Sequence, residues 1–493
     1  MKSKQKYIFL LLGPIAMLVI ESLGKPASMP LEAFHLLGIT AWIAIWWITE
    51  AVPIAVTALL PIVLFPLFGI LNLSETTGSF GHKYVFLYVG GFVIAIAIEK
   101  WNLHKRIALS IIQLIGTNMI NIILGFMVAT AFLSMWISNT ATSVMMLPMG
   151  MAITVQLRNS PGVSENESTL FGKAIMLAIA YSASIGGIAT LIGTPPNLVF
   201  AGIVQDTYGI EISFLEWFKF GLPIAIILLF ACWKYLTRLA FKFESASFPG
   251  GKKEIKRLIA ELGPFGKEEK SVMIVFMLTA FCWITRSFLL QRFLPALDDT
   301  IIAIAAAILI FSLPASEKGK RLLTWTEAVK MPWGIILLFG GGMALAEGFM
   351  QTGLAAWIGN QLSLLEGVTI ILVIITIVAS VNFLTEMTSN LATTAMLLPV
   401  LAPMAVAFDM HPYILMVAAT MAASCAFMLP VATPPNAVVF GSGYLHIQDM
   451  MRTGIWMNII SIILISAAVY FALPYVWQID LNSYPELLRV KLK

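Results

Sequence analysis

Two short polar motifs interrupt apolar stretches of this chain, and they carry residue types that bind ions and carboxylates. The first is SNTATSVMMLP (138–148) and the second is SNLATTAMLLP (389–399). Side-chain oxygens of Ser, Thr and Asn are ligands that hard cations such as sodium prefer over nitrogen or sulfur. Asn and Thr also donate hydrogen bonds, as a bound carboxylate requires. The two motifs therefore predict binding of a cation, an anion or both.

A second motif, Thr-Pro-Pro-Asn, also occurs twice in apolar surroundings, at 194–197 and at 433–436. Proline lacks a backbone donor and clashes with a preceding helical turn, so each copy predicts a break within a helix. A break leaves free carbonyls at one helix end and free N–H groups at the start of the next. The carbonyl ends suit a cation, and the N–H ends suit an anion.

The composition places these breaks inside a membrane. The chain has 493 residues, 59% hydrophobic and only 11% charged, with a mean hydropathy of +0.90. Soluble domains carry about 25% charged residues. Apolar runs of roughly 20 residues recur, which is long enough for a helical crossing, and the alternation typical of barrel strands is absent. The sequence predicts an all-α polytopic membrane protein.

The apolar runs predict eleven crossings, and the stretches 118–157 and 367–408 are predicted as re-entrant hairpins that enter and leave on one side. The crossings are expected at 7–23, 34–48, 52–71, 83–99, 171–205, 214–237, 271–292, 299–314, 333–350, 411–440 and 452–475. Basic residues gather at Lys2–Lys6, between 238 and 270, and between 318 and 330, which places these segments and the N-terminus in the cytoplasm.

The polar motifs belong to an internal repeat. The two SN motifs share seven of eleven residues at an offset of 251, and Gly90-Gly91 falls on Gly341-Gly342 at the same offset. Lys and Arg follow the first glycine pair at 100–106, whereas the matching stretch 351–366 has none. The copies are thus predicted to face opposite sides of the membrane. Inverted repeats of this kind are typical of secondary transporters.

Simpler interpretations exist for each motif taken alone. A single Ser-Asn is an ordinary helix N-cap, and a single Thr-Pro-Pro-Asn is an ordinary turn. Their pairing and repetition inside apolar spans favour a binding site. Glu50 and Glu386 lie beside predicted breaks, and Glu386 either tunes a cation site or caps a neighbouring helix. An intramembrane enzyme would need a nucleophile–base pair or metal ligands, and the sequence offers neither.

The chain resembles the divalent anion:sodium symporter (DASS) family. The resemblance is carried by blocks that run through nearly the whole chain: WWITEAVPIAVTALLP (46–61), SMWISNTATSVMMLP (134–148), GTPPN (193–197), LTWTEAVKMPWGIILLFGGG (323–342), FLTEMTSNLATTAMLLP (383–399) and ASCAFMLPVATPPNAVV (423–439). The resemblance implies a homodimer in which a mobile transport domain moves substrate past a scaffold domain by an elevator mechanism. It also implies C4-dicarboxylates, citrate or sulfate as substrates, usually driven by sodium.

The resemblance further implies site residues. One sodium site is expected at Ser134, Ser138, Asn139 and Gly193, and its symmetry mate at Thr385, Thr388, Asn390 and Ala432. Substrate contacts are expected from Asn139, Thr140, Thr194, Asn390, Thr433 and Pro434. One position departs from the pattern, because Leu391 stands where a threonine would match Thr140. The two carboxylates of a substrate would then meet unlike surroundings.

The sequence thus predicts a sodium-coupled symporter of the cytoplasmic membrane for small di- or tricarboxylates such as succinate, malate or fumarate, without covalent cofactor, nucleic-acid partner or enzymatic activity. Alternatives are a sodium-independent dicarboxylate exchanger and a sulfate or citrate transporter. The expected segments are scaffold spans 1–117, transport repeat 118–237, linker and second scaffold segment 238–366, transport repeat 367–475, and an extracytoplasmic tail 476–493.

Overall fold

The protein is helical, with helices linked by turns and short connections. The computed structural model describes residues 3–116, 118–160, 163–243, 250–362 and 369–489. Among these, one isolated β-bridge, between Pro314 and Arg321, is the extent of β-structure. The predicted all-α class is confirmed. Some sequence predictions fall on residues outside the described ones. They are Lys2, parts of two predicted loops (161–162 and 244–249), the segment boundaries at 117/118 and 366/367, and the end of the tail (490–493).

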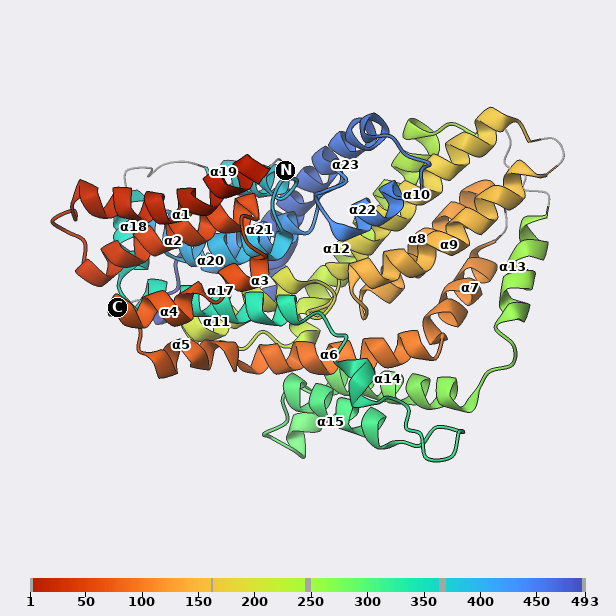
Figure 1. The fold of residues 1–493 in the computed structure, drawn as a ribbon, viewed down its shortest axis with the longest axis horizontal. Helices are drawn as coiled ribbons and strands as arrows, with labels where there is room; N and C mark the ends of the chain where they lie inside the picture. The colour runs from red at the N-terminus through yellow and green to blue at the C-terminus, as the bar shows by residue number, and fades with distance from the viewer. Residues whose placement is uncertain (1–2, 117, 161–162, 244–249, 363–368, 490–493) are drawn as a thin grey trace.

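The first half of the chain is a series of helices that ends with a π-helical turn (Figure 1). They are α1 (Ser3–Leu23), α2 (Leu31–Thr49), α3 (Ile54–Thr57), α4 (Leu60–Leu67), α5 (Leu73–Phe80), α6 (Lys83–Lys100), α7 (Leu103–Ile115), α8 (Met119–Ser134), α9 (Asn139–Arg158), α10 (Glu165–Gly187), α11 (Pro195–Tyr208), α12 (Phe214–Tyr235) and the turn Leu236–Ala240.

The second half has a comparable series. Its elements are α13 (Gly251–Glu261), α14 (Lys267–Thr285), a 3₁₀ turn (Leu290–Arg292), α15 (Asp299–Ser312), α16 (Trp325–Ala328), α17 (Trp333–Gln351), α18 (Leu354–Leu362), α19 (Ile370–Leu384), α20 (Asn390–Ala407), α21 (Pro412–Ala423), α22 (Pro434–Phe440), α23 (Ile447–Ala467), a π-helical turn (Ala468–Ala472), α24 (Leu473–Trp477) and α25 (Glu486–Arg489).

Eight helical segments among the described residues are long and apolar enough to cross a membrane. They are Leu31–Thr49, Leu73–Lys100, Asn139–Arg158, Glu165–Gly187, Phe214–Ala240, Trp333–Gln351, Asn390–Ala407 and Ile447–Trp477. Six further apolar segments have only 10–17 residues. Helices that are separated by a break can complete a crossing together, so the count of eleven stays a prediction.

The helix breaks lie where the polar motifs predict them. α8 and α9 are separated by residues 135–138, and α19 and α20 by 385–389. The expected spans 171–205 and 411–440 are each divided midway, by residues 188–194 and 424–433. Backbone groups that leave a helix inside a membrane must be satisfied by protein or water, so these four breaks require dedicated partners.

The two repeats interlock through their short half-helices. α10 packs against both α8 and α9, and α21 packs against both α19 and α20. α22 of the second repeat then packs on α9 and α10, while α11 of the first packs on α20 and α21. Figure 1 shows α8, α9 and α10 lying side by side, with α22 next to them. Because each repeat packs its short half-helix on the other repeat, all four breaks lie close together.

Candidate functional site

The four breaks surround a cavity of about 660 Å³. The six residues expected to contact substrate all line it: Asn139, Thr140, Thr194, Asn390, Thr433 and Pro434. Thr140 and Thr433 are 293 positions apart in the chain. The cavity lining contains one charged side chain, Glu50, and no Lys, Arg or His among the described residues. An anion bound here would rest on neutral donors, helix ends and co-bound cations.

Helix N-termini meet at this cavity. α9 begins directly after Ser138, whose hydroxyl accepts a hydrogen bond from Ala141 N at 3.3 Å. α11 and α20 begin after Thr194 and Ser389, which also line the cavity. Thr433 precedes the short α22. The first turns of these helices supply unpaired N–H groups and partial positive charge, which suit a carboxylate.

The first predicted sodium site forms a compact set of oxygens. Ser134 Oγ lies 2.6 Å from the Asn139 amide and donates to Ala183 O at 2.7 Å. The same end of the Asn139 amide lies 3.2 Å from both Gly193 O and Ala183 O. Without a cation, this end of the amide is best occupied by the nitrogen, which donates hydrogen bonds to the surrounding oxygens. With a cation bound among these oxygens, the amide oxygen takes this place and becomes a ligand. The donor set therefore fits sodium.

Close backbone approach explains the glycine in this set. A Cβ atom on Gly193 would lie 2.5 Å from Gly187 O, and one on Gly187 would lie 2.7 Å from Asn139 Oδ1. Any larger residue at either position would push the α10–α11 break away from the SN motif. The two glycines thus hold the carbonyl of residue 193 beside the Asn139 amide.

The second predicted sodium site repeats this arrangement. Thr385 lies 251 positions after Ser134, and its hydroxyl donates to Asn390 Oδ1 at 2.8 Å and to Ala423 O at 3.0 Å. Ala432, also predicted for this site, lines the cavity beside it. The hydroxyls of Ser134 and Thr385 are both fully buried behind the cavity. The serine of one repeat and the threonine of the other therefore do the same thing: each hydroxyl links the asparagine of its SN motif to a backbone carbonyl.

Thr388 is arranged differently from the other members of the second set. It lines the cavity, but its hydroxyl bonds to Leu384 O at 2.9 Å and to Thr393 Oγ1 at 2.6 Å. The hydroxyl is thus engaged within its own break and not with Asn390. Its role as a cation ligand stays a prediction.

The asparagines of the two Thr-Pro-Pro-Asn motifs hold the breaks in shape. Asn197 Nδ2 bonds to the carbonyls of Gly187, Ile188 and Thr190 at 3.2, 3.3 and 2.7 Å. Asn436 Nδ2 bonds in the same way to Ala426 O at 3.3 Å and Leu429 O at 3.0 Å. These bonds satisfy carbonyls that the breaks would otherwise leave unpaired in an apolar interior.

Glu386 binds the α21–α22 connection rather than the end of a neighbouring helix, and its predicted influence on a cation site stays a prediction. Its buried carboxylate accepts hydrogen bonds from the backbone N–H groups of Phe427, Met428 and Leu429 at 2.7, 2.9 and 3.0 Å. Asn458 Nδ2 donates to it at 2.8 Å. The carboxylate therefore satisfies the N–H groups of the α21–α22 connection.

Sequence reasoning missed the wall opposite the polar motifs. Tyr88 and Phe92 of α6, with residues at the start of α17 and in the α2–α3 connection, complete the cavity. Glu50, in that connection, has a left-handed backbone (φ 47°) and an exposed side chain. A non-glycine residue in this conformation is uncommon, and such strain gathers at functional sites. The repeated Gly90-Gly91 pair lies between Tyr88 and Phe92, but it does not indicate a binding role for either aromatic residue.

Leu391, the counterpart of Thr140 in the second repeat, lines the cavity. The side chain is 4% exposed. The two ends of the cavity thus differ by a hydroxyl at this position, as the sequence predicts.

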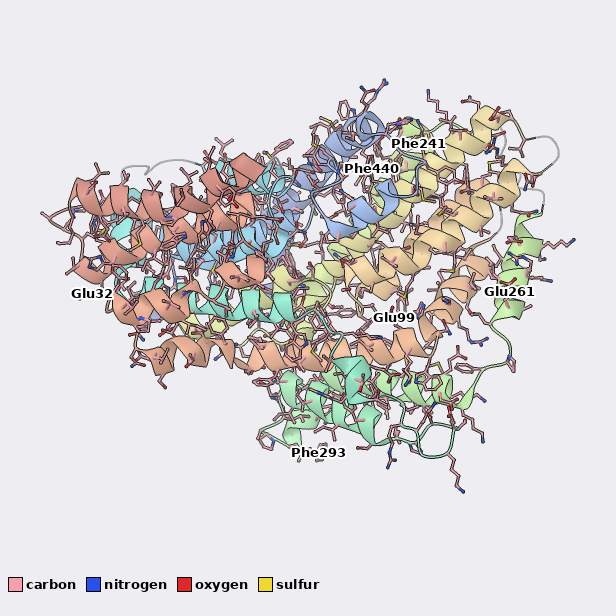
Figure 2. The ribbon with its side chains drawn as sticks, in the orientation of Figure 1. Glu32, Glu99, Phe241, Glu261, Phe293 and Phe440 are labelled. Carbon is pink, nitrogen blue, oxygen red and sulfur yellow. The ribbon has the colours of Figure 1, made fainter. Side chains whose placement is uncertain are left out.

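A second cavity, of about 740 Å³, lies between α6–α7, α9 and α13. Glu99 of α6 and Glu261 of α13, both labelled in Figure 2, belong to its lining. Arg106 and Glu269 in this lining pair with each other at 2.6 Å. None of the predicted site residues lies here. The smaller cavity is therefore the candidate site.

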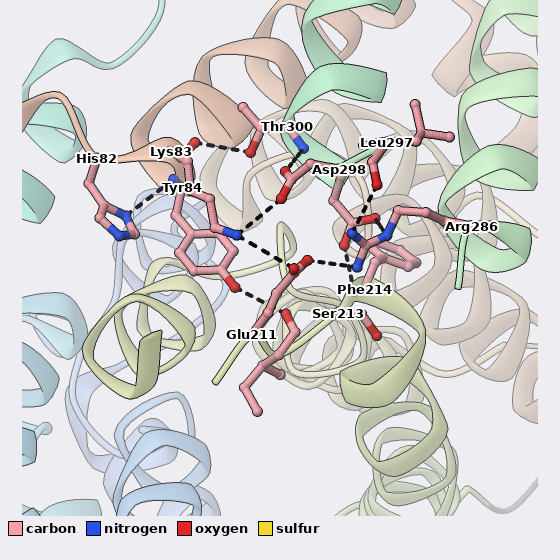
Figure 3. Close-up of polar contacts among 12 residues, drawn as sticks. His82, Lys83, Tyr84, Glu211, Ser213, Phe214, Arg286, Leu297, Asp298 and Thr300 are labelled. Carbon is pink, nitrogen blue, oxygen red and sulfur yellow. Dashed lines mark hydrogen bonds and ion pairs between the residues drawn. The ribbon is translucent and has the colours of Figure 1, made fainter. Parts of the chain in front are cut away.

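A charged network joins the α11–α12 connection to the ends of α6, α14 and α15 (Figure 3). Glu211 of this connection lies 2.7 Å from Arg286 and 3.7 Å from Lys83. Arg286 also pairs with Asp299 at 2.8 Å, and Asp299 accepts a bond from Phe214 N at 2.8 Å. Glu211 is thus shared between cations of two other helices.

Asp298 completes the network beside Lys83, at 3.0 Å. Burial alone would raise the pKa of Asp298, but hydrogen bonds from Thr300 N and from Lys83 outweigh it and hold the pKa below its ordinary value. Asp298 therefore carries its charge at neutral pH and keeps Lys83 positioned near Glu211.

Comparisons with known proteins agree with this geometry. Residues 4–477 match the family model described as "Sodium:sulfate symporter transmembrane region". A protein of Staphylococcus saprophyticus named "Sodium-dependent dicarboxylate transporter SdcS" is 47% identical over 480 residues, which cover 96% of this chain and 92% of the relative. Its namesake from Staphylococcus aureus strain USA300 is 47% identical over 495 residues, with 98% and 95% covered.

Two solved structures resemble the fold at low sequence identity. Neisseria gonorrhoeae MtrF has a TM-score of 0.56 at 12% identity, with 92% of this chain and 98% of that one covered. The Alcanivorax borkumensis YdaH transporter has a TM-score of 0.52 at 13% identity, with 82% and 88% covered. These likenesses concern the fold alone.

Proposed function

Since the chain belongs to the sodium:sulfate symporter family, and is therefore a transporter and not an enzyme, we propose that it carries small dicarboxylates such as succinate, malate or fumarate into the cell with sodium ions. The observation that carries this proposal is the cavity where two paired sets of oxygens and several helix N-termini meet, with no basic side chain among the described residues that line it. Neutral donors alone hold a dianion weakly, so cations bound beside it supply the missing positive charge.

The residues that would hold sodium are Ser134, Ser138, Asn139 and Gly193 in one set and Thr385, Thr388, Asn390 and Ala432 in the other. Sodium would supply positive charge next to the carboxylates, and its gradient would drive uptake. The cavity of about 660 Å³ has room for a small dicarboxylate.

The remaining architecture belongs to the same proposal. Segments 118–237 and 367–475 form a transport domain of two inverted repeats, each with a re-entrant hairpin, and segments 1–117 and 238–366 form a scaffold. The protein works as a homodimer in the cytoplasmic membrane, with a cytoplasmic N-terminus and an extracytoplasmic tail at 476–493. The matching hydrogen bonds of the two repeats support the repeat itself, and the basic residues at 100–106, which the stretch 351–366 lacks, support its inversion.

Uptake of labelled succinate into proteoliposomes tests the proposal. An inward sodium gradient is expected to drive accumulation, and replacing sodium with potassium is expected to abolish it. A second set of vesicles, preloaded with succinate or a keto-dicarboxylate, tests exchange. Stimulation by preloaded substrate alone would replace the symporter by a sodium-independent exchanger. Absence of dicarboxylate transport in both arms would overturn both.

The elevator movement has its own prediction at Glu211. This residue connects two helices of the transport domain, while Lys83 and Arg286, its partners, lie on scaffold helices (Figure 3). Movement of the domain must separate them. Glu211→Gln is therefore expected to disfavour the present arrangement by about three- to tenfold, since a partly exposed ion pair contributes about 1 kcal/mol.

Distances measured between spin labels on the two domains, with Glu211→Gln beside wild type, test this expectation. Glu261→Gln is the control, because it removes an exposed ion pair within α13. Identical distance distributions in wild type and Glu211→Gln would contradict a role of this ion pair in the movement.

A further inference from the structure

The wall of the cavity that faces the polar motifs is almost entirely apolar. It is built from the α2–α3 connection, α6 and the start of α17, all of which belong to the proposed scaffold. Two of its side chains carry polar atoms, Glu50 and Tyr88. A carboxylate repels a dianion, which leaves the Tyr88 hydroxyl as the one side-chain hydrogen-bond donor among the described residues of this wall.

The Tyr88 hydroxyl is free to take a ligand. The side chain is 5% exposed, and its hydroxyl has no hydrogen-bond partner among the described residues. The hydroxyls of Tyr181 and Tyr413 are also unpaired, but both are fully enclosed by protein. The unpaired hydroxyl of Tyr88 is not fully enclosed. The Tyr88 oxygen therefore borders open space, and the space that the residue lines is the cavity.

The position of Tyr88 on α6 is fixed by its neighbours. One turn before it, the Tyr84 hydroxyl donates to Ile212 O at 3.2 Å, which ties the helix to the α11–α12 connection. One turn after it, the Phe92 ring packs on the Tyr88 ring with centroids 4.7 Å apart. A Cβ atom on Gly91, on the same part of the helix, would lie 3.7 Å from Ile192, so this part of α6 lies against the residue that precedes Gly193. The ring is thus held at the level of the α10–α11 break.

We propose that Tyr88 is a substrate-binding residue of the scaffold, whose hydroxyl donates a hydrogen bond to a carboxylate of the bound dicarboxylate. The inference rests on the proposed function and adds a contact that the repeated motifs do not provide. The carboxylate held by the helix N-termini has neutral donors around it, and the Tyr88 hydroxyl supplies a donor from the opposite side. Glu50 on the same wall disfavours any carboxylate that shifts toward it.

The contact exists in one arrangement of the domains only. At the repeat offset of 251, Tyr88 corresponds to Phe339 of α17, which has no hydroxyl and is buried. When the transport domain moves relative to α6, the site leaves Tyr88, and no second tyrosine replaces it at the equivalent position. Tyr88 therefore raises substrate affinity on one face of the membrane and not on the other.

Tyr88→Phe tests the inference, because it removes one oxygen and keeps the ring. Transport is measured in right-side-out and inside-out membrane vesicles, with KM for succinate, Vmax and the sodium concentration for half-maximal rate. We expect KM to rise about ten- to a hundredfold on one face and to stay within twofold on the other, as loss of one hydrogen bond to a charged group predicts. Vmax and sodium dependence are expected to stay within twofold.

Tyr181→Phe is the matched control, since it removes an unpaired hydroxyl that is enclosed in α10 away from the cavity. Equal KM values for wild type, Tyr88→Phe and Tyr181→Phe on both faces would overturn the inference and leave the proposed function intact. A fall in Vmax with equal KM changes on both faces would also overturn it, because it would indicate a structural role. Failure of the wild-type protein to transport any dicarboxylate would overturn the proposed function itself, and the inference with it.

Discussion

Asn390→Ala is expected to abolish sodium-driven succinate uptake, by more than about 100-fold, while the protein still folds. Asn390 is the first residue of α20, lines the cavity, and accepts the Thr385 hydroxyl at 2.8 Å. Its amide thus joins the predicted cation set to the substrate cavity. Alanine removes the oxygen ligand and the donor together, so cation and anion binding are lost at once. The backbone of α20 is unaffected, because alanine favours a helix.

The same change at Asn139 is expected to have the same effect, because the Asn139 amide lies 2.6 Å from Ser134 Oγ and 3.2 Å from the carbonyls of Ala183 and Gly193. Uptake assays in proteoliposomes, with size-exclusion chromatography to verify folding, measure both variants. Asn482→Ala, on the exposed tail near the end of the described chain, is the control. Normal transport by both cavity variants would show that the site lies elsewhere.

The sequence predicted the polar half of the candidate site and little of the other half. Site residues that belong to an internal repeat can be recognised in the sequence, because equivalent positions must form the same contacts in both copies. Ser134 and Thr385 differ in type, yet both bond an asparagine five residues later and the carbonyl of an alanine. Tyr88 lies in an ordinary apolar helix, and only packing against a distant break brings it to the cavity. Such positions have no local pattern to reveal them.

Helix breaks were predictable, but the lengths of the helices between them were not. Proline and the Ser-Asn pairs mark where a helix stops, since their backbone or side-chain chemistry competes with helical hydrogen bonds. α22 has seven residues and ends before Gly441, whereas α11, its counterpart, has fourteen and ends before Gly209. The two Thr-Pro-Pro-Asn motifs are identical and give no measure of this difference.

Glu386 carries the second prediction with a large expected effect. Its carboxylate binds three consecutive backbone N–H groups and the Asn458 amide, all within a buried part of the protein. The position 251 residues earlier is Met135, whose carbonyl accepts the Thr190 hydroxyl at 2.6 Å. In the second repeat a carboxylate, that of Glu386, thus joins the two helix breaks, whereas in the first repeat the Thr190 hydroxyl does so.

Removing the Glu386 carboxylate should therefore loosen the connection that carries Ala423 O, Ala432 and Thr433 to the cavity. Each buried N–H group left unpaired costs about 1–3 kcal/mol, so Glu386→Ala is expected to lower the melting temperature strongly. Glu386→Gln keeps the shape and one acceptor. It is expected to fold, with sodium half-saturation raised about tenfold and KM for succinate rising as sodium is lowered.

Thermal unfolding in detergent measures the effect on stability, and sodium titrations of uptake measure the effect on sodium binding. Met135→Leu is the matched control in the first repeat. Met135 contributes its backbone carbonyl, so leucine is expected to preserve both stability and sodium dependence. If Glu386→Gln unfolded at the wild-type temperature and kept the wild-type sodium dependence, the carboxylate would not be what holds the second break. The amide oxygen of the glutamine alone would then be sufficient to keep the α21–α22 connection in place.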